Sequence, residues 1–214
     1  MTFFLLAFPA LLSIINPLGG AFVFLGATQG LSPESRAQLA RWVAIHSFII
    51  LNASLYIGAY VLEFFGISIP VLRVAGGIII AMSGWRMLYA DEKTPRDGTL
   101  NIATSQDASR AAFFPLTMPF TTGPGTIAVA IALGSSRPSA PGKILMFVLA
   151  ELLTTVLLSV LIYLCYRYSD RVSRAVGPTG TTIIVRLSAF LLFCIGVQVL
   201  WTGAAELLAS VGKT

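Results

Sequence analysis

Long stretches without a charged residue alternate with short polar segments along the whole chain. Residues 1–33, 42–62, 111–136 and 187–205 carry no charge. A helix that crosses the hydrocarbon core of a membrane needs about 20 apolar residues. The pattern therefore predicts an all-α membrane protein with six transmembrane helices, at residues 2–28, 38–63, 70–89, 112–134, 143–166 and 183–209.

Composition supports the same class of protein. Of the 214 residues, 56% are hydrophobic and only 11% are charged, whereas a soluble domain carries about 25% charged residues. Too few charges are present to cover a water-soluble globule, which excludes a cytosolic enzyme. The N-terminal apolar run has no basic segment before it and is too long for a signal peptide, so we expect it to be the first span.

Basic residues gather on one side of the predicted bundle. The segments after spans one, three and five hold nine of the 14 lysines and arginines. Because cytoplasmic segments are enriched in Lys and Arg, we expect this side to be cytoplasmic and both termini to lie outside. The net charge of +5 is then an orientation signal, and no clustered basic surface for nucleic acid is expected.

The chain divides into two similar halves within one membrane domain. Residues 91–111 mix charged residues with Gly, Pro, Ser and Thr, which predicts a cytoplasmic linker between repeat one, 1–90, and repeat two, 112–214. Pro17 and Pro124 interrupt the first span of each half, 107 residues apart. Three spans per half place the halves in opposite orientations, so we expect an inverted repeat, as in many secondary transporters.

Each proline should divide its span into two half-helices. Proline removes a backbone donor and disfavours helix before it, and Asn16 or Thr122 can cap the helix that follows. The N-terminus of a half-helix offers N–H donors and partial positive charge, which suits a carboxylate. The residues expected around such a ligand are Asn16, Pro17, Gly19 and Gly20 at the first break and Thr121, Thr122, Gly123, Pro124, Gly125 and Thr126 at the second.

Four segments of the sequence resemble the MarC family of bacterial inner-membrane proteins: INPLGGAFVF, FGISIPVLRVAGGIIIAMSGWRML, PLTMPFTTGPGTIAVAI and RLSAFLLFCIGVQ. The resemblance covers essentially the whole chain apart from 91–111, and its NP and GPGT motifs are the most specific. It implies discontinuous first and fourth spans at 16–20 and 122–126, and transport of small neutral amino acids such as glycine and alanine. Other members have been linked to multiple antibiotic resistance. The amino-acid substrate is implied by the resemblance alone.

Other polar residues inside the spans leave two interpretations open. Glu151 either binds a coupling proton or the substrate ammonium, or forms an interhelical hydrogen bond as a neutral carboxyl. Asn52 lines the same cavity or bonds a neighbouring helix. Arg73 and Arg186 either extend to the interface or pair with an acid or a helix end, and we expect His46 to pack rather than relay protons. We expect no enzyme, cofactor or metal site, because the sequence contains no catalytic motif and no Cys/His metal spacing.

The leading hypothesis is a secondary transporter of small neutral amino acids that works by alternating access in the bacterial inner membrane. Its expected partners are the amino acid, membrane lipid and a coupling ion, either proton or sodium. Whether the protein forms a homo-oligomer is left open. Two alternatives are an exporter of drugs or metabolites and a membrane scaffold or regulatory protein without transport. An exporter predicts a wider, more aromatic cavity than the small residues at the breaks suggest.

Overall fold

The computed structural model describes residues 2–28, 31–89, 110–138 and 141–211, and these contain helices and no strand. The elements are α1 (Thr2–Ile15), α2 (Pro17–Ala27), α3 (Pro33–Phe64), α4 (Ile69–Leu88), η1 (Ala112–Thr121), α6 (Pro124–Gly134), α7 (Pro141–Arg167) and α8 (Ser169–Val211). Five helices are long and apolar enough to cross a membrane, with α1 and α2 together forming one of them. The bent pair of η1 and α6 makes a sixth. The predicted all-α membrane fold is confirmed.

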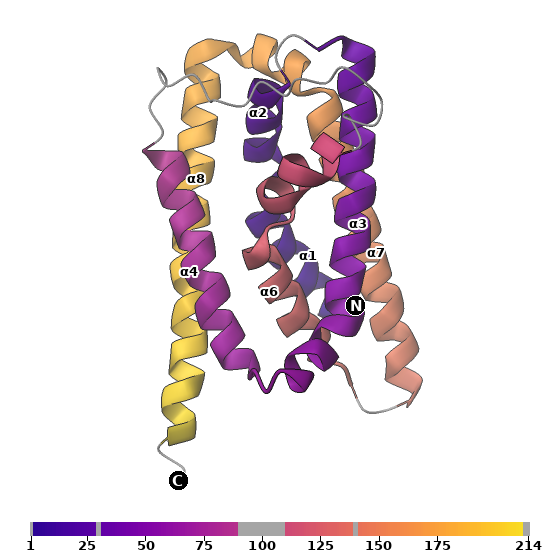
Figure 1. The fold of residues 1–214 in the computed structure, drawn as a ribbon, viewed down its shortest axis with the longest axis vertical. Coiled ribbons are helices and arrows are strands. Elements are labelled where there is room, and N and C mark those ends of the chain that lie inside the picture. Colours follow the sequence, from indigo (N-terminus) through magenta and orange to yellow (C-terminus); the bar gives the residue numbers. More distant parts are fainter. Residues whose placement is uncertain (1, 29–30, 90–109, 139–140, 212–214) are drawn as a thin grey trace.

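Two helices begin earlier than the uncharged runs predict. α3 begins at Pro33 instead of residue 38, because the Ser32 hydroxyl accepts a hydrogen bond from the Ser35 N–H at 3.2 Å and caps the helix. α8 begins at Ser169 instead of residue 183, and Gly177, at φ 74°, separates a short first segment from the membrane-crossing part. Figure 1 shows this first segment lying across one end of the bundle.

The first and fourth predicted spans are both broken, as expected. Asn16 interrupts the first with a left-handed backbone conformation between α1 and α2. The second break is sharper, with an angle of 66° between η1 and α6. η1 itself is irregular, because Pro115 and Pro119 lie within it and the backbone at Phe114 and Met118 is extended.

The helices pack in pairs across the two halves of the chain. α4 packs most extensively against α8, and α3 packs against α7. α1 and α2 lie against α7 and α8, whereas η1 packs on α3 and α6 packs on both α3 and α4 (Figure 1). Both broken spans are therefore held between longer continuous helices. The inverted repeat itself stays a prediction.

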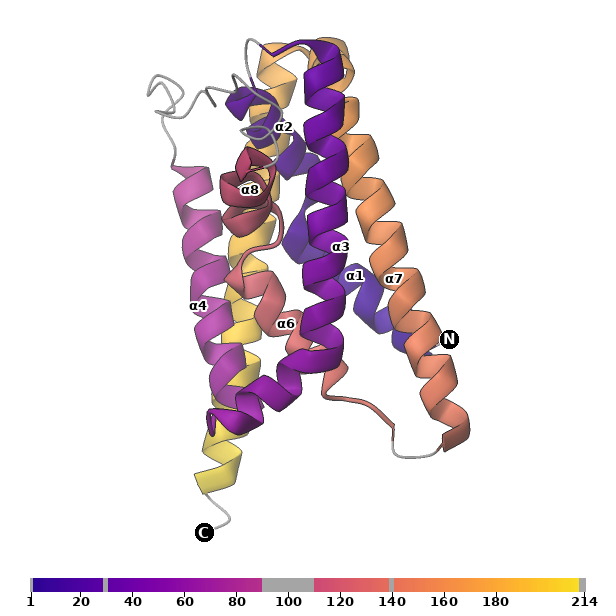
Figure 2. The ribbon, with the colours of Figure 1, turned by 45° about the vertical axis from the view of Figure 1, so that its right-hand side comes forward.

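The two ends of the bundle carry different connections. Figure 2 shows the turn between α3 and α4, the connection after α6 and the C-terminal end of α8 at one end, and the start of α3 and the α7–α8 connection at the other. At the latter end, Arg36 and Asp170 form an ion pair at 3.8 Å that links α3 to α8. Most of the predicted linker, 91–111, lies outside the described residues.

Candidate functional site

The first break is organised by the backbone and side chain of Asn16. Its φ of 46° and ψ of 62° turn the chain out of α1 and into α2. The Asn16 side-chain oxygen accepts a hydrogen bond from the Gly19 N–H at 3.2 Å, and the Asn16 backbone carbonyl accepts one from the Gly20 N–H at 2.8 Å. Pro17 has no N–H to give. The remaining donor of this first turn is the Leu18 N–H, so α2 has a largely capped N-terminus.

The same break leaves a carbonyl without its usual partner. In a continuous helix the N–H of residue 17 would bond the carbonyl of Ser13, four residues earlier. Pro17 cannot supply that donor. The Ser13 carbonyl therefore lacks its helical donor at the first break, whereas both Asn16 oxygens already accept from Gly19 and Gly20.

The second break leaves backbone donors unpaired. Gly123 precedes α6 and no side chain caps this helix, while Pro124 occupies its first position. The Ile127 N–H bonds the Gly123 carbonyl at 3.0 Å. The N–H groups of Gly125 and Thr126 are left without an acceptor inside the helix. Both residues are buried, so the N-terminus of α6 presents donors and partial positive charge to the interior of the bundle.

Threonine hydroxyl groups satisfy part of the backbone before the second break. Thr117 and Thr121 donate to the carbonyls of Ala112 and Leu116, at 2.6 and 2.7 Å. Thr122 donates to the buried Ser47 hydroxyl of α3 at 2.9 Å. The first two bonds stay within η1, and the third ties the end of this irregular segment to α3.

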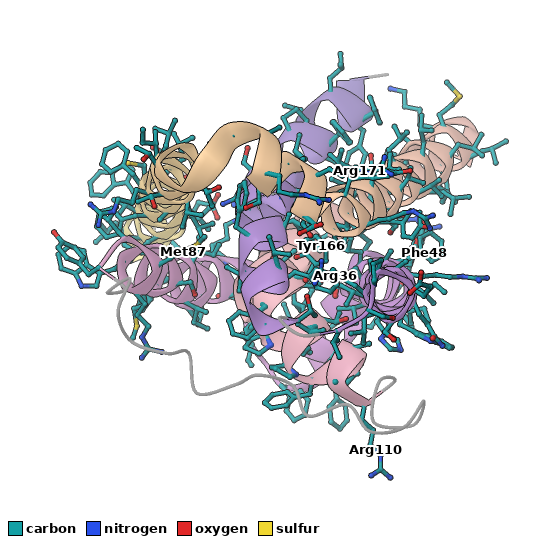
Figure 3. The ribbon with its side chains drawn as sticks, turned by 90° about the horizontal axis from the view of Figure 1, so that it is seen from above. Arg36, Phe48, Met87, Arg110, Tyr166 and Arg171 are labelled. Carbon is teal, nitrogen blue, oxygen red and sulfur yellow. The ribbon has the colours of Figure 1, made fainter. Side chains whose placement is uncertain are left out.

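Tyr166 of α7 lies between the two breaks. Its hydroxyl is 2.8 Å from the Thr121 hydroxyl, and its ring stacks on Phe24 of α2 with centroids 4.8 Å apart. The same hydroxyl would be 2.6 Å from a Cβ atom added to Gly20. The side chain is 1% exposed, and Figure 3 shows it in the interior of the bundle. The structure thus joins Gly20 of the first break and Thr121 of the second through a residue that the sequence analysis did not select.

Sequence alone held a partial signal for Tyr166. It continues the buried face of α7, which includes Leu158 and Ile162 at the spacing of one helix turn. This periodicity predicts burial. It does not reveal which groups meet the hydroxyl, because those come from α2 and η1.

A cavity of about 360 Å³ lies beside the first break. This volume is near the lower end of the roughly 300–1,000 Å³ range of small-molecule sites. The cavity is bordered by α1, α2, α7 and α8, and its polar lining comes from Ser13, Asn16 and Ser188. The rest of its lining is mainly aliphatic: Leu12, Pro17, Leu18, Leu161, Cys165, Leu191 and Ile195.

Glu151 and Asn52 lie at the interface of α7 and α3, separate from this cavity. Glu151 is 0% exposed, and no hydrogen bond reaches either carboxyl oxygen. The Asn52 amide donates to the Thr155 hydroxyl at 3.1 Å and to the Phe48 carbonyl at 2.8 Å. An interhelical hydrogen bond is therefore present at Asn52. At Glu151 no donor lies within 3.5 Å of the carboxyl, and the Tyr56 side chain of α3 interacts with it.

The remaining charged and titratable candidates form an ion pair, are exposed, or pack against aromatic rings. Arg73 forms an ion pair with Glu206 that joins α4 to α8, and Arg186 is exposed on α8. The ring of His46 contacts those of Trp42 and Phe113, at centroid distances of 5.8 and 5.5 Å. Among the described residues, no three His, Cys, Asp or Glu side chains are placed to hold a metal ion.

These features define a multi-pass integral membrane protein with two broken spans that meet in its interior. A model for the MarC family integral membrane protein matches residues 1–208, and the chain belongs to this family. It is 36% identical over 203 residues to the inner membrane protein MarC of Escherichia coli O1:K1 / APEC, with 92% of each chain covered. To the protein of that name from Salmonella paratyphi A it is 34% identical over 203 residues, again with 92% of each chain covered.

No solved structure matches the chain. The names of the relatives and the apolar helices agree on a multi-pass protein of the inner membrane.

Proposed function

We propose that the chain is a secondary transporter of small neutral amino acids, with glycine and alanine as the first substrates to test. The observation that carries this proposal is the meeting of two broken spans at Tyr166 in the interior of the bundle. Irregular backbone inside a membrane is tolerated where it is buried in protein or faces a water-filled cavity. In secondary transporters such breaks bind substrate and ions.

The two breaks offer complementary chemistry for a zwitterion. The uncapped N-terminus of α6 offers the Gly125 and Thr126 N–H groups to a carboxylate. At the first break, the Ser13 carbonyl and the second lone pairs of the two Asn16 oxygens can accept from an ammonium group. We therefore assign the carboxylate to the second break and the ammonium to the first. This assignment needs no charged side chain, which agrees with the uncharged stretches around both breaks.

The packing of the helices supports alternating access. α4 and α8 make a close pair, as Gly77 and Gly84 lie against the backbone of α8. α3 and α7 form a second pair, joined by the bond between Asn52 and Thr155. Movement of these pairs relative to each other would open the breaks first to one side of the membrane and then to the other.

One observation favours a second function, export of apolar compounds. The cavity beside the first break is lined mainly by aliphatic side chains, and such a surface suits an apolar solute better than a zwitterion. This alternative predicts that apolar dyes and drugs, rather than amino acids, are transported.

Transport by the purified protein in proteoliposomes separates these functions. We expect saturable uptake of labelled glycine or alanine under an imposed gradient of proton, sodium or substrate, and no movement of an apolar dye. Uptake of the dye alone would favour the exporter. No movement of glycine or alanine under any of the gradients would refute the proposed function.

A variant of the second break separates a transporter from a scaffold. The double substitution Pro124→Ala, Gly125→Ala restores helix-forming residues at the start of α6. We expect it to abolish amino-acid uptake, with Gly142→Ala as the control, since a Cβ atom at Gly142 meets nothing within 4 Å. If the double variant lacks uptake and still replaces the unmodified protein in cells, the scaffold is favoured.

A further inference from the structure

We propose that Glu151 is the proton-binding site through which this transporter is driven, a role that rests on the proposed function. Glu151 lies nine residues into the membrane-crossing part of α7 that begins at Gly142, or about 14 Å along the helix axis. The membrane-crossing part has 26 residues, so Glu151 lies about one helix turn from its midpoint, well inside a hydrocarbon core about 30 Å thick. The whole side chain is inaccessible to solvent.

Among the described residues, the carboxyl has no ion-pair partner and no hydrogen-bond donor within 3.5 Å, and only the Tyr56 side chain and Arg137 favour its charged form. Neither oxygen receives a hydrogen bond, and no ion pair of the described residues includes Glu151. An ionised carboxylate buried without a partner costs several kcal/mol. A carboxyl in this position becomes neutral by taking up one proton, and it releases that proton only when water or a cation reaches it.

The groups around Glu151 are few. From α3, the Tyr56 side chain reaches the same turn of α7 and interacts with the Glu151 carboxyl, while its hydroxyl donates to the Val148 carbonyl at 3.3 Å. Arg137, in the connection after α6, is the cation whose field acts on the carboxyl. α1 and α2 contain no titratable side chain.

These surroundings favour a proton over sodium. A hard cation such as sodium needs several oxygen ligands around it. The Thr154 and Thr155 hydroxyls donate to carbonyls of their own helix, and the Tyr56 hydroxyl that interacts with the carboxyl donates to the Val148 carbonyl. A single carboxyl without a set of oxygen ligands around it binds a single proton.

α3 connects this carboxyl to the second break. One face of α3 bears Tyr56 and Asn52 against α7, and another bears Ser47, which accepts a hydrogen bond from Thr122. Ionisation of Glu151 would draw water or Arg137 into the α3–α7 interface. A shift of α3 there moves Ser47 against the break, so the protonation state of Glu151 and access to the substrate are coupled.

The test compares exchange with driven accumulation of labelled alanine in proteoliposomes. With an inward proton gradient of about one pH unit, one proton per substrate supports about tenfold accumulation in the unmodified protein. We expect Glu151→Gln to exchange internal for external alanine but to lose this accumulation. Glu151→Asp should retain it, and so should the control Glu63→Gln, an exposed carboxyl at the end of α3.

Two transport results would overturn the proposal. Accumulation by Glu151→Gln equal to that of the unmodified protein removes Glu151 from the coupling. Accumulation driven by sodium and not by protons leaves the proposed function intact but contradicts the proton site.

Infrared spectroscopy separates failure of this proposal from failure of the proposed function. We expect the carbonyl band of a protonated carboxyl in the unmodified protein, decreasing as the pH rises and absent from Glu151→Gln. If alanine is not transported at all, the amino-acid function fails, yet this band still shows a proton site at Glu151. The absence of a pH-dependent band assigned to Glu151 contradicts the site whatever the substrate is.

Discussion

Tyr166 and Gly20 show how closely single residues determine the geometry between the breaks. The Tyr166 hydroxyl occupies the space that any side chain at position 20 would enter, and it also contacts the Thr121 hydroxyl. The ring carbons of Tyr166 would lie at an ordinary contact distance of 3.4 Å from a Cβ atom at position 20. The steric overlap with a Cβ atom at position 20 is therefore confined to the Tyr166 hydroxyl oxygen.

This contact predicts a specific pattern in a double-mutant cycle. Gly20→Ala should cost about 1–3 kcal/mol of stability through overpacking. The cost should decrease when Tyr166→Phe removes the hydroxyl, so that the double variant loses less stability than the two single variants combined. Thermal unfolding in detergent measures all four proteins, with Gly142→Ala as the control. Equal costs in the Tyr and Phe backgrounds would show that the hydroxyl does not limit position 20.

Asn16 combines a left-handed backbone with a side-chain cap, and two substitutions separate these roles. Glycine adopts the left-handed conformation freely and costs only a few tenths of a kcal/mol at a helix N-cap. Alanine loses the cap and also pays about 1–2 kcal/mol for the conformation. We expect Asn16→Ala to lower the unfolding temperature in detergent more than Asn16→Gly. The reverse order would contradict the observed geometry of the first break.

At the scale of elements, the close packing of α4 on α8 depends on glycine. A Cβ atom on Gly77 would approach the Leu200 Cα atom to 2.7 Å, and one on Gly84 would approach the Phe193 N atom to 2.5 Å. Backbone atoms cannot rotate away as side chains do. The pair can accommodate such an atom only if the helices separate.

We therefore predict that Gly77→Ala and Gly84→Ala each destabilise the protein by about 1–3 kcal/mol. Gly142→Ala, at the exposed start of α7, should leave stability within about 0.5 kcal/mol. Midpoints of thermal unfolding in detergent provide the comparison. Unchanged midpoints for both α4 variants would indicate that α4 and α8 are not in contact in the protein.

The sequence predicted where the helices lie better than how the broken spans run. Uncharged runs locate the spans because membrane helices exclude charge, and Pro17 and Pro124 mark the breaks because they lack N–H groups. The start of α8 at Ser169 was missed, since its first segment is polar and lies at the end of the bundle. The path of η1 and the position of Tyr166 depend on contacts between distant segments, which local patterns do not encode.

At the scale of the whole molecule, charge predicts which end of the bundle faces the cytoplasm. Arg36, Arg171 and Arg174 lie at the end that carries the α7–α8 connection (Figure 3 labels the first two). The positive-inside rule assigns this end to the cytoplasm and the C-terminus to the outside. A C-terminal alkaline phosphatase fusion should then be active, and a C-terminal green fluorescent protein fusion dark. Fluorescence from the latter would reverse the orientation.

The transport of a small zwitterion through the paired breaks is the central claim about the whole molecule. It depends on donors at the start of α6 and acceptors at the first break, held together by Tyr166. The substrate is recognised through both of its charged groups and is confined by small residues of the protein. Other small neutral amino acids should therefore compete with it for binding. Large or charged ones should not compete.

Counterflow of labelled alanine in proteoliposomes tests this claim most directly, because it requires only binding and alternating access. Vesicles loaded with unlabelled alanine should take up labelled alanine saturably, and external glycine should compete while tryptophan and glutamate should not. The double variant Pro124→Ala, Gly125→Ala should show no counterflow. Vesicles of the unmodified protein that take up label no faster than protein-free vesicles would contradict the account.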